Sequence, residues 1–393
     1  MGGVLNVFTS DKGIIGDRKR DAATGLVTFG RAGLAPLFAL SSGMKQEVAK
    51  STSFDWVEKE ALRGQLKVTN NAGTGTTLTV ADPSEVLPNT VLVSGSGEMM
   101  LATAISGNNL TVIRGFAGTS AAAINGSSTA VDVQILNQLF EENSAAPTAL
   151  MGLGVKRDNY IQIFRNTWGL SRTADQSDYY TGNKHAETKR EAENLHFRSI
   201  ERQLWFGNKH EGTVTTPTGT KTYRMTRGVI PSLETNVEAS GNGNLKASEL
   251  NAFLEGVFSY KLDSAKENQR IAFCGQQVLT AVGTLAEING QMNLSAGQRM
   301  YGLDIHEWVT PHGTIKLMTN PLFTESPLWR GHLAVLHPEA ITLKYMAKTL
   351  HADATVPGTD GKSGVYTSEL GLKLEVEKVH GVYTNIQKGV AED

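Results

Sequence analysis

The stretch from Thr181 to Gly207, TGNKHAETKREAENLHFRSIERQLWFG, decides how the rest of this chain is interpreted. Between Asn183 and Phe206 it contains neither proline nor glycine, and it is rich in Ala, Glu, Lys, Arg and Leu, which favour helices. Thr181 and Asn183 are candidate N-caps, and Gly207 is a candidate C-cap. Together these features predict one helix of roughly 24 residues, about 36 Å long at about 1.5 Å per residue.

Only the second half of this helix is amphipathic. Phe197, Ile200 and Leu204 share one stripe on a period of 3.6 residues, whereas Arg190 and Glu193 interrupt that stripe in the first half. A helix that is polar all round over half its length lies across a domain rather than inside it. Its charged face is therefore either solvated or in contact with neighbouring subunits.

Composition restricts the class of protein. A chain of 393 residues suits two or three domains, and a formal net charge of -2 with scattered basic residues gives no polyanion-binding signal. The single cysteine, Cys274, lies in an apolar run and reads as a core residue. The sequence shows no signal peptide and no membrane-spanning segment, so we expect a soluble protein kept in a cytoplasm-like space.

Residues 1–44 are rich in glycine and have short apolar runs without a sustained period. We expect an extended arm here. An arm cannot bury its own apolar side chains, so Leu34, Leu37, Phe38 and Leu40 are expected to pack on something else.

Two ribbon strands are predicted at 46–61 and 160–175, each partnering the other, with a different kind of sequence between them. From residue 70 to 130 only four residues are charged, and β-prone runs alternate with turn signals about every ten residues. This favours a small inserted barrel or sandwich. Its predicted strands are 77–80, 90–93, 99–105, 109–113 and 131–136.

The C-terminal half predicts two helices against a mixed sheet, which is an α+β domain. A core-facing helix is expected from Leu250 to Leu262 and a second at about 276–288. A glycine and threonine loop is expected at 212–219, followed by a strand at 222–230. The other predicted strands are 271–274, 303–309, 314–319, 332–337 and 340–346, with a final ribbon at 371–384.

The chain lacks the common motifs of nucleotide-binding, zinc-dependent and serine-nucleophile enzymes. His185 and His196 are three turns apart on the predicted helix and cannot share a metal. Arg114 to Ser120 resembles a phosphate loop only loosely, and a tight turn is favoured. Four further histidines lack regular ligand spacing: His306, His312, His332 and His337. We expect no catalytic residues, no cofactor and no metal.

Taken in order, these pieces resemble the major capsid proteins of tailed double-stranded DNA bacteriophages, which have the Hong Kong 97 fold. The resemblance is to the SU-ten-type branch. It is carried by residues 53–58, 162–164, 170–174, the predicted helix, 205–207 and 224–228, and by residues 97–100, 110–115 and 118–119 of the insertion.

The resemblance implies an α+β, Hong Kong 97-like capsid fold with a long spine helix, an extended β-ribbon loop, an axial α+β domain and an inserted all-β domain. The implied divisions are 1–44 for the N-terminal arm, 45–65 and 137–180 for the extended loop and its approaches, 66–136 for the inserted β-rich domain, 181–219 for the spine helix and loop of the peripheral domain, 220–346 for the axial domain, and 347–393 for the return to the peripheral domain.

The implied function is self-assembly through hexamers and pentamers into an icosahedral shell that encloses the double-stranded DNA genome. Implied partners are a portal, scaffold, decoration or minor capsid proteins, and packaged DNA through weak non-specific contact, with no membrane. The implied location of the protein is the virion capsid, which is assembled in the host bacterial cytoplasm. The arm is short, so scaffold is either separate or already removed. Two alternatives remain open, another phage structural protein such as a decoration or tail component, and a cytoplasmic enzyme.

In that setting an arm that cannot cover its side chains and a long ribbon supply contacts to neighbouring subunits. The expected contact residues are Leu37, Phe38, Phe54, Trp56, Trp168, Arg172, Arg190 and Glu193.

Overall fold

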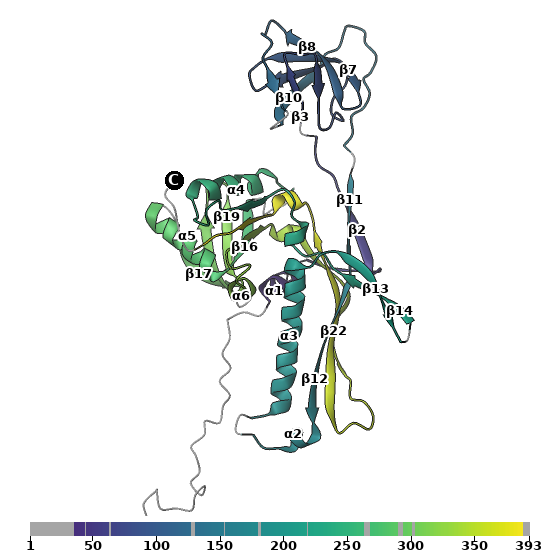
Figure 1. Cartoon of the computed structure of the whole chain (residues 1–393), viewed down its shortest axis with the longest axis vertical. Helices are drawn as coiled ribbons and strands as arrows, with labels where there is room; N and C mark the ends of the chain where they lie inside the picture. Colours follow the sequence, from purple (N-terminus) through teal and green to yellow (C-terminus); the bar gives the residue numbers. More distant parts are fainter. Residues whose placement is uncertain are drawn as a thin grey trace, which may run out of the picture. The chain divides into compact units, whose positions relative to one another are not determined.

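The computed structural model describes residues 35–43, 45–62, 64–126, 130–152, 154–179, 182–217, 219–262, 268–289, 294–300 and 303–387. Most of the predicted arm, including Leu34, and the side chain of Leu40 lie outside the described residues. The chain divides into two compact units, one formed by Met1–Trp56 with Asp158–Asp393 and the other by Val57–Arg157 (Figure 1). Each unit is described by itself.

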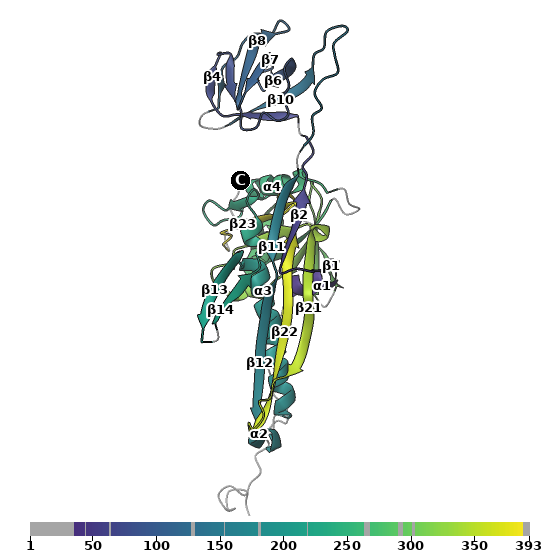
Figure 2. The ribbon, with the colours of Figure 1, turned by 90° about the vertical axis from the view of Figure 1, so that its right-hand side faces the viewer.

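The first unit contains the predicted long helix, α3 (Lys184–Phe206). Its start is capped by Asn183, whose side chain accepts a hydrogen bond from the backbone N–H of Ala186, and Gly207 follows its end, so the helix prediction is confirmed. Figure 2 shows α3 running along a four-stranded sheet in the order β1-β21-β22-β12. These strands are β1 (Lys45–Val48), β21 (Ile341–Asp353), β22 (Gly361–Leu374) and β12 (Gln162–Ser171).

The predicted pairing of the two ribbon strands is wrong. All ten residues of β12 pair with β22, from Gln162 opposite Leu370 to Ser171 opposite Gly361. The ribbon consists instead of β2 (Ser53–Glu58) and β11 (Val155–Tyr160), which form their own two-stranded sheet. The alternation of a strand indicates which side chains face the core, but it does not indicate which distant strand completes its hydrogen bonds.

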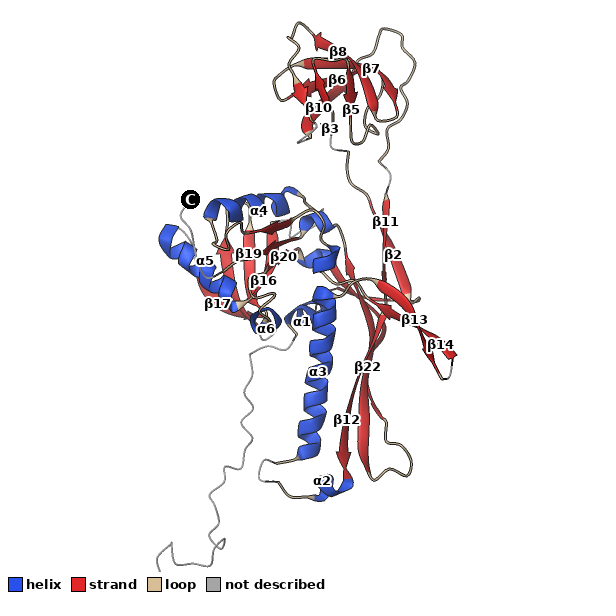
Figure 3. Ribbon diagram, viewed as in Figure 1, coloured by secondary structure: helices blue, strands red, loops and turns tan. Residues whose placement is uncertain are grey.

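The other layer of the first unit is a seven-stranded sheet in the order β15-β23-β20-β16-β19-β18-β17 (Figure 3). Its strands are β15 (Val237–Ala239), β16 (Gln269–Cys274), β17 (Leu294–Met300), β18 (Leu303–Val309), β19 (Thr314–Thr319), β20 (Leu333–Leu336) and β23 (Gly381–Thr384). The helices α4 (Ala247–Ser259) and α5 (Gln276–Asn289) confirm both helix predictions for this region.

This sheet separates two cores because side chains alternate along each strand. On β16, Ala272 and Cys274 pack with the buried faces of α4 and α5, whereas Ile271 and Phe273 pack with α3. The short helices α1 (Pro36–Gly43), α2 (Arg172–Gln176) and α6 (Pro321–Glu325) complete the unit, with 3-10 turns at Ile230–Ser232, Pro338–Ala340 and Glu377–Val379.

Strand β21 belongs wholly to the four-stranded sheet, and β23 returns to the seven-stranded sheet. The division of the chain into arm, peripheral, axial and inserted domains stays a prediction. The expected loop at 212–219 is largely strand, because β13 (His210–Thr216) pairs with β14 (Gly219–Met225) in a hairpin.

The second unit is built on a six-stranded sheet in the order β3-β10-β6-β7-β8-β5, with a small β4-β9 pair. Its strands are β3 (Gln65–Val68), β4 (Asn71–Gly73), β5 (Thr77–Thr79), β6 (Thr90–Ser94), β7 (Met99–Ser106), β8 (Asn109–Phe116), β9 (Ile124–Asn125) and β10 (Val131–Gln138). All five strands predicted here are therefore confirmed.

A buried ion pair explains the sequence that loosely resembled a phosphate loop. The Arg114 guanidinium donates to both carboxylate oxygens of Glu98, at 2.7 and 2.6 Å, and also to the carbonyl oxygens of Gly73, Gly75 and Ala122. The arginine is thus fully engaged inside the unit and stabilises the loops around it.

Candidate functional site

An aromatic side chain holds the base of the ribbon on the four-stranded sheet β1-β21-β22-β12, which we call the long sheet. Phe54 and Trp56 lie on the same face of β2, both half-buried, with ring centroids 6.1 Å apart. Phe54 packs where β22 has a glycine, since a Cβ at Gly371 would lie 2.9 Å from its ring. The Lys344 ammonium lies 5.9 Å from the centre of the same ring. Phe54 therefore anchors the ribbon within its own subunit.

Beyond Trp56 the chain forms a narrow double segment that exposes apolar side chains. Segment 57–62 runs beside residues 150–152 and 154–155, because a Cβ at Gly154 would lie 2.4 Å from Val57 Cγ1, and one at Gly152 would lie 3.6 Å from Leu62 Cδ2. We call these two segments the apolar neck. Its exposed side chains are Val57 (70%), Leu62 (48%), Leu150 (43%), Met151 (74%) and Val155 (57%). Two adjacent chain segments cannot form a core of their own.

The arm residues predicted to contact neighbours are covered by their own chain. Leu37 is completely buried and packs in the core that contains Ile200 and Leu204. Phe38 stacks on Phe197 of α3 with ring centroids 5.6 Å apart. Helix α3 of the same chain thus supplies the apolar environment of Leu37, and its contact with a neighbouring subunit stays a prediction.

Glu201 of α3 is a fully buried carboxylate. Its oxygens accept hydrogen bonds from the backbone N–H groups of Leu37 (3.0 Å) and Phe38 (2.8 Å), from Trp205 Nε1 (2.8 Å) and from Asn320 Nδ2 (3.1 Å). Burial raises the pKa of Glu201, and these four donors act in the opposite direction.

The spacing of Arg198 and Glu201 predicts an ion pair along the helix surface, and this prediction is wrong. The structure instead pairs Arg198 with Glu325 of α6 and buries Glu201. The signal that could have indicated this burial is the position of Glu201 beside Ile200 and ahead of Leu204, on the apolar side of the helix.

Trp168 also lies inside its own subunit, between α3 and the long sheet. It packs with Ala192 and Tyr366, and its Nε1 donates to His351 Nε2 at 2.9 Å. The ring of His185 stands edge-on to it, at a centroid distance of 4.8 Å. Its own chain leaves Trp168 only 8% exposed, and its contact with a neighbouring subunit stays a prediction.

The predicted charged contact residues remain at the surface. Arg172 pairs with Asp360 at 2.8 Å, and both side chains are largely exposed. Arg190 is exposed on α3, while Glu193 is half-buried. Desolvation, and secondarily the charge of Glu193, raises the pKa of Tyr366.

Three side chains are hydrogen-bonded in the sequence found in catalytic triads, which is a nucleophile, a base and an orienting group. Ser368 Oγ lies 2.7 Å from His196 Nε2, and Asn166 Oδ1 lies 3.0 Å from His196 Nδ1. Ser368 and His196 are completely buried beneath α3, so no substrate can approach them. Burial also lowers the pKa of His196. The arrangement is a structural hydrogen-bond network that fixes the helix on the sheet.

The part of the chain that the structure describes contains no group of three or more His, Cys, Asp or Glu side chains placed to hold a metal. Within the same described ranges, no helix is long and apolar enough to cross a membrane.

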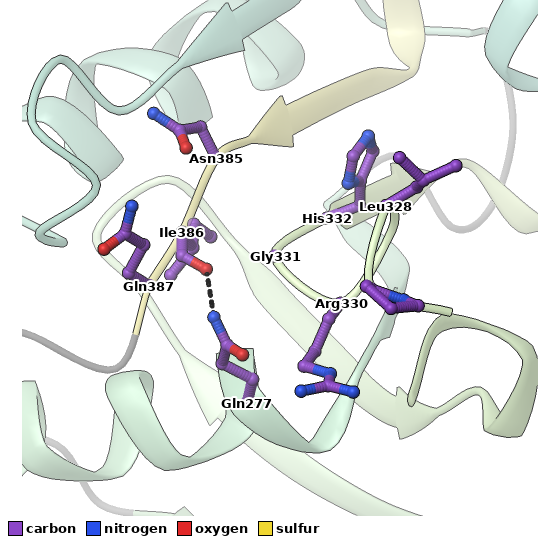
Figure 4. A pocket seen from close by; sticks show the side chains of 9 residues that line it. Gln277, Leu328, Arg330, Gly331, His332, Asn385, Ile386 and Gln387 are labelled. Carbon is purple, nitrogen blue, oxygen red and sulfur yellow. Dashed lines mark hydrogen bonds between the residues drawn. The ribbon is translucent and has the colours of Figure 1, made fainter. Parts of the chain in front are cut away.

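A hollow of about 250 Å³ lies on the first unit beside the end of β23. Figure 4 shows Gln277 donating to the carbonyl oxygen of Ile386, at 2.9 Å, with Arg330 and His332 on the facing loop. Its lining contains no Asp or Glu that could pair with His332 as acid and base. The hollow therefore offers no convergent catalytic set.

Three features define the class of protein. They are a long helix on a four-stranded sheet, a ribbon that leaves that sheet, and a second sheet flanked by two helices. These features are those of a capsid protein with the Hong Kong 97-like fold. The family described as SU10 major capsid protein matches residues 31–387, and the chain belongs to that family.

The comparisons also found individual proteins that are similar to this chain. The major capsid protein of Pseudomonas phage PaMx41 is 26% identical over 382 residues, which cover 91% of this chain and 90% of that protein. The capsid of a native GTA particle is similar in structure, with a TM-score of 0.50, 10% identity and coverage of 98% of this chain and 100% of that one. The capsid of Myoviridae phage XM1 gives a TM-score of 0.45, 12% identity and coverage of 92% and 95%.

The chain is thus a major capsid protein of a tailed phage, the structural subunit of an icosahedral shell. Membership of this family rules out the alternative of a decoration or tail component.

Proposed function

We propose that the apolar neck and the ribbon face with Trp56 form the principal contact between neighbouring subunits of the shell. The observation that carries the proposal is the exposure of five large apolar side chains on two adjacent segments that cannot cover them. Burial of apolar surface contributes about 25 cal/mol per Å², so covering such a neck stabilises each contact by a few kcal/mol at most. A closed shell repeats that contact many times, and its copies support one another.

Charged residues at the far end of the long sheet supply further contacts in this proposal. Arg172 and Arg190 are exposed, and Glu193 lies on the same helix as Arg190. Exposed ion pairs contribute little individually, about 0 to 1 kcal/mol, so these residues select the register of neighbours rather than supply the main stabilisation.

The wider assignment follows from family membership and composition. In this proposal the shell is built from hexamers and pentamers, the seven-stranded sheet and its helices form the axial domain, and assembly takes place in the host bacterial cytoplasm. A portal joins the shell, with scaffold, decoration or minor capsid proteins where the phage has them. The net charge of -2 favours weak, non-specific contact with packaged DNA. We assign the subunit no catalytic activity.

The neck is tested by placing a charge in its centre. Met151→Asp is expected to leave both units folded, because Met151 is 74% exposed, and to abolish closed shells in negative-stain electron microscopy. The matched control is Ile113→Asp, which charges another exposed apolar residue of the same unit (50% exposed) and is expected to leave shells intact. Normal shells from Met151→Asp, or equal loss of shells in both variants, would reject the neck as the specific contact.

A further inference from the structure

The buried carboxylate of Glu201 lies where three parts of the first unit meet. It belongs to α3, it accepts both backbone donors from α1, and it accepts a side-chain donor from Asn320 at the start of α6. None of the contacts proposed between subunits uses this residue, and its burial is complete to within 1%.

Glu201 acts on α1 as a cap supplied by another helix. The first N–H groups of a helix point away from its own carbonyl groups and take a partner from outside. Pro36 has no N–H, and the next two, on Leu37 and Phe38, both point at the Glu201 carboxylate. Negative charge is favourable at a helix N-terminus. A helix of 8 residues is marginal on its own, so α1 depends on this anchor and on the packing of its side chains.

The same carboxylate reaches the seven-stranded sheet through Asn320. This residue follows β19 directly, and its backbone N–H donates to the carbonyl oxygen of Cys274 on β16, at 2.8 Å. Its side-chain oxygen caps α6 by accepting from Leu322 N, at 2.9 Å, while its Nδ2 donates to Glu201. Asn320 is completely buried, so it couples the end of the sheet to α3.

Helix α1 in turn leads into the edge strand of the long sheet. Strand β1 pairs in parallel with β21, from Lys45 opposite Thr342 to Val48 opposite Tyr345, and Glu47 forms an ion pair with Lys344. The anchored helix α1 is therefore separated by one residue from the edge strand β1 of the long sheet.

We propose that Glu201 is a positioning residue for shell assembly, which holds α1, the long helix and the seven-stranded sheet in one fixed relation. A closed symmetric shell requires every subunit to present the same geometry to its neighbours, since a heterologous contact whose rotation does not close continues as an open assembly. Loss of the anchor leaves a subunit that is folded but variable at this junction.

The test is Glu201→Gln in the full-length chain. Glutamine keeps the size of the side chain but replaces one acceptor oxygen with an N–H₂ group, which then faces donors. Amide hydrogen exchange over 36–43 is expected to become on the order of tenfold or more faster, the equivalent of losing one or two buried hydrogen bonds. Exchange in α4 and α5 is expected to stay unchanged, while electron microscopy is expected to show open or misclosed particles.

The matched control is Glu98→Gln, which removes the charge of another buried carboxylate that accepts several donors, in the second unit. It is expected to leave exchange over 36–43 unchanged. If Glu201→Gln fails to fold, Trp205→Phe removes a single donor from the same carboxylate and is read in the same way.

Three results would overturn the proposal. They are unchanged exchange over 36–43, faster exchange there together with normal shells, and a uniform rise of exchange throughout the first unit. The last result would mean that Glu201 only stabilises the fold. Because the neck lies in the other unit, Met151→Asp gives normal exchange over 36–43, and so the failure of either proposal can be recognised separately.

Discussion

Replacement of Trp168 by alanine tests whether this residue stabilises its own subunit or contacts a neighbouring one during shell assembly. The indole is 8% exposed, packs with Ala192 and Tyr366, and donates a hydrogen bond to His351. Removing a buried Trp side chain costs about 3 to 5 kcal/mol. Trp168→Phe keeps most of the ring and loses mainly the hydrogen bond, so we expect a cost of about 1 kcal/mol for that bond.

The assay is native-state hydrogen exchange of the unassembled subunit, because a chain with two units has no single unfolding transition. The amides of β12 and β22 pair directly beneath α3, so they report the local free energy of opening. A loss of 3 to 5 kcal/mol accelerates their exchange by a factor of about 10² to 10³ or more, at about 1.4 kcal/mol per tenfold.

Trp56→Ala supplies the contrast. Trp56 is half-buried on the ribbon, and we expect little change of exchange in β12 and β22 but a lower yield of shells. The reasoning is refuted if Trp168→Ala prevents assembly while β12 and β22 exchange at the wild-type rate. Trp168 would then act between subunits rather than within one.

Two further predictions concern titratable groups. The hydrogen bond from Arg114 is the main cause that lowers the pKa of Glu98 from 4.5 to about 2. This carboxylate therefore stabilises the second unit above pH 4.5, and the contribution, about 3 kcal/mol, is lost as the pH falls towards 2. Amide hydrogen exchange in β6, β7 and β8, corrected for the intrinsic exchange rate at each pH, should show that loss, and an identical profile for Glu98→Gln would contradict it. Burial raises the pKa of Cys274 to about 12, so a thiol reagent should label the native protein only after unfolding, and rapid stoichiometric labelling at neutral pH would contradict its placement.

Local features were readable from the sequence because their causes are local. The cap at Asn183 and the absence of helix breakers determine where α3 begins and continues, and the 3.6-residue period from Leu250 onwards specifies the buried face of α4. The strands of the second unit follow from alternating runs and turn residues. The order of these elements was sufficient to indicate the family.

Partnership between distant residues depended on the tertiary structure. The pattern of β12 distinguishes an inner from an outer face, yet its partner β22 begins about 190 residues later, and only the closed sheet selects it.

Glu201 and Trp168 show that the burial of a side chain, like the pairing of strands, depended on the tertiary structure. A polar residue on a helix reads as solvated until another helix and a sheet bring donors to it, and a Trp on a strand reads as a possible contact until α3 covers it. Sequence by itself determined the elements, their faces and the family, because these depend on neighbouring residues along the chain. Which groups became buried anchors and which apolar surfaces stayed open was decided by packing, because burial is a property of what lies opposite.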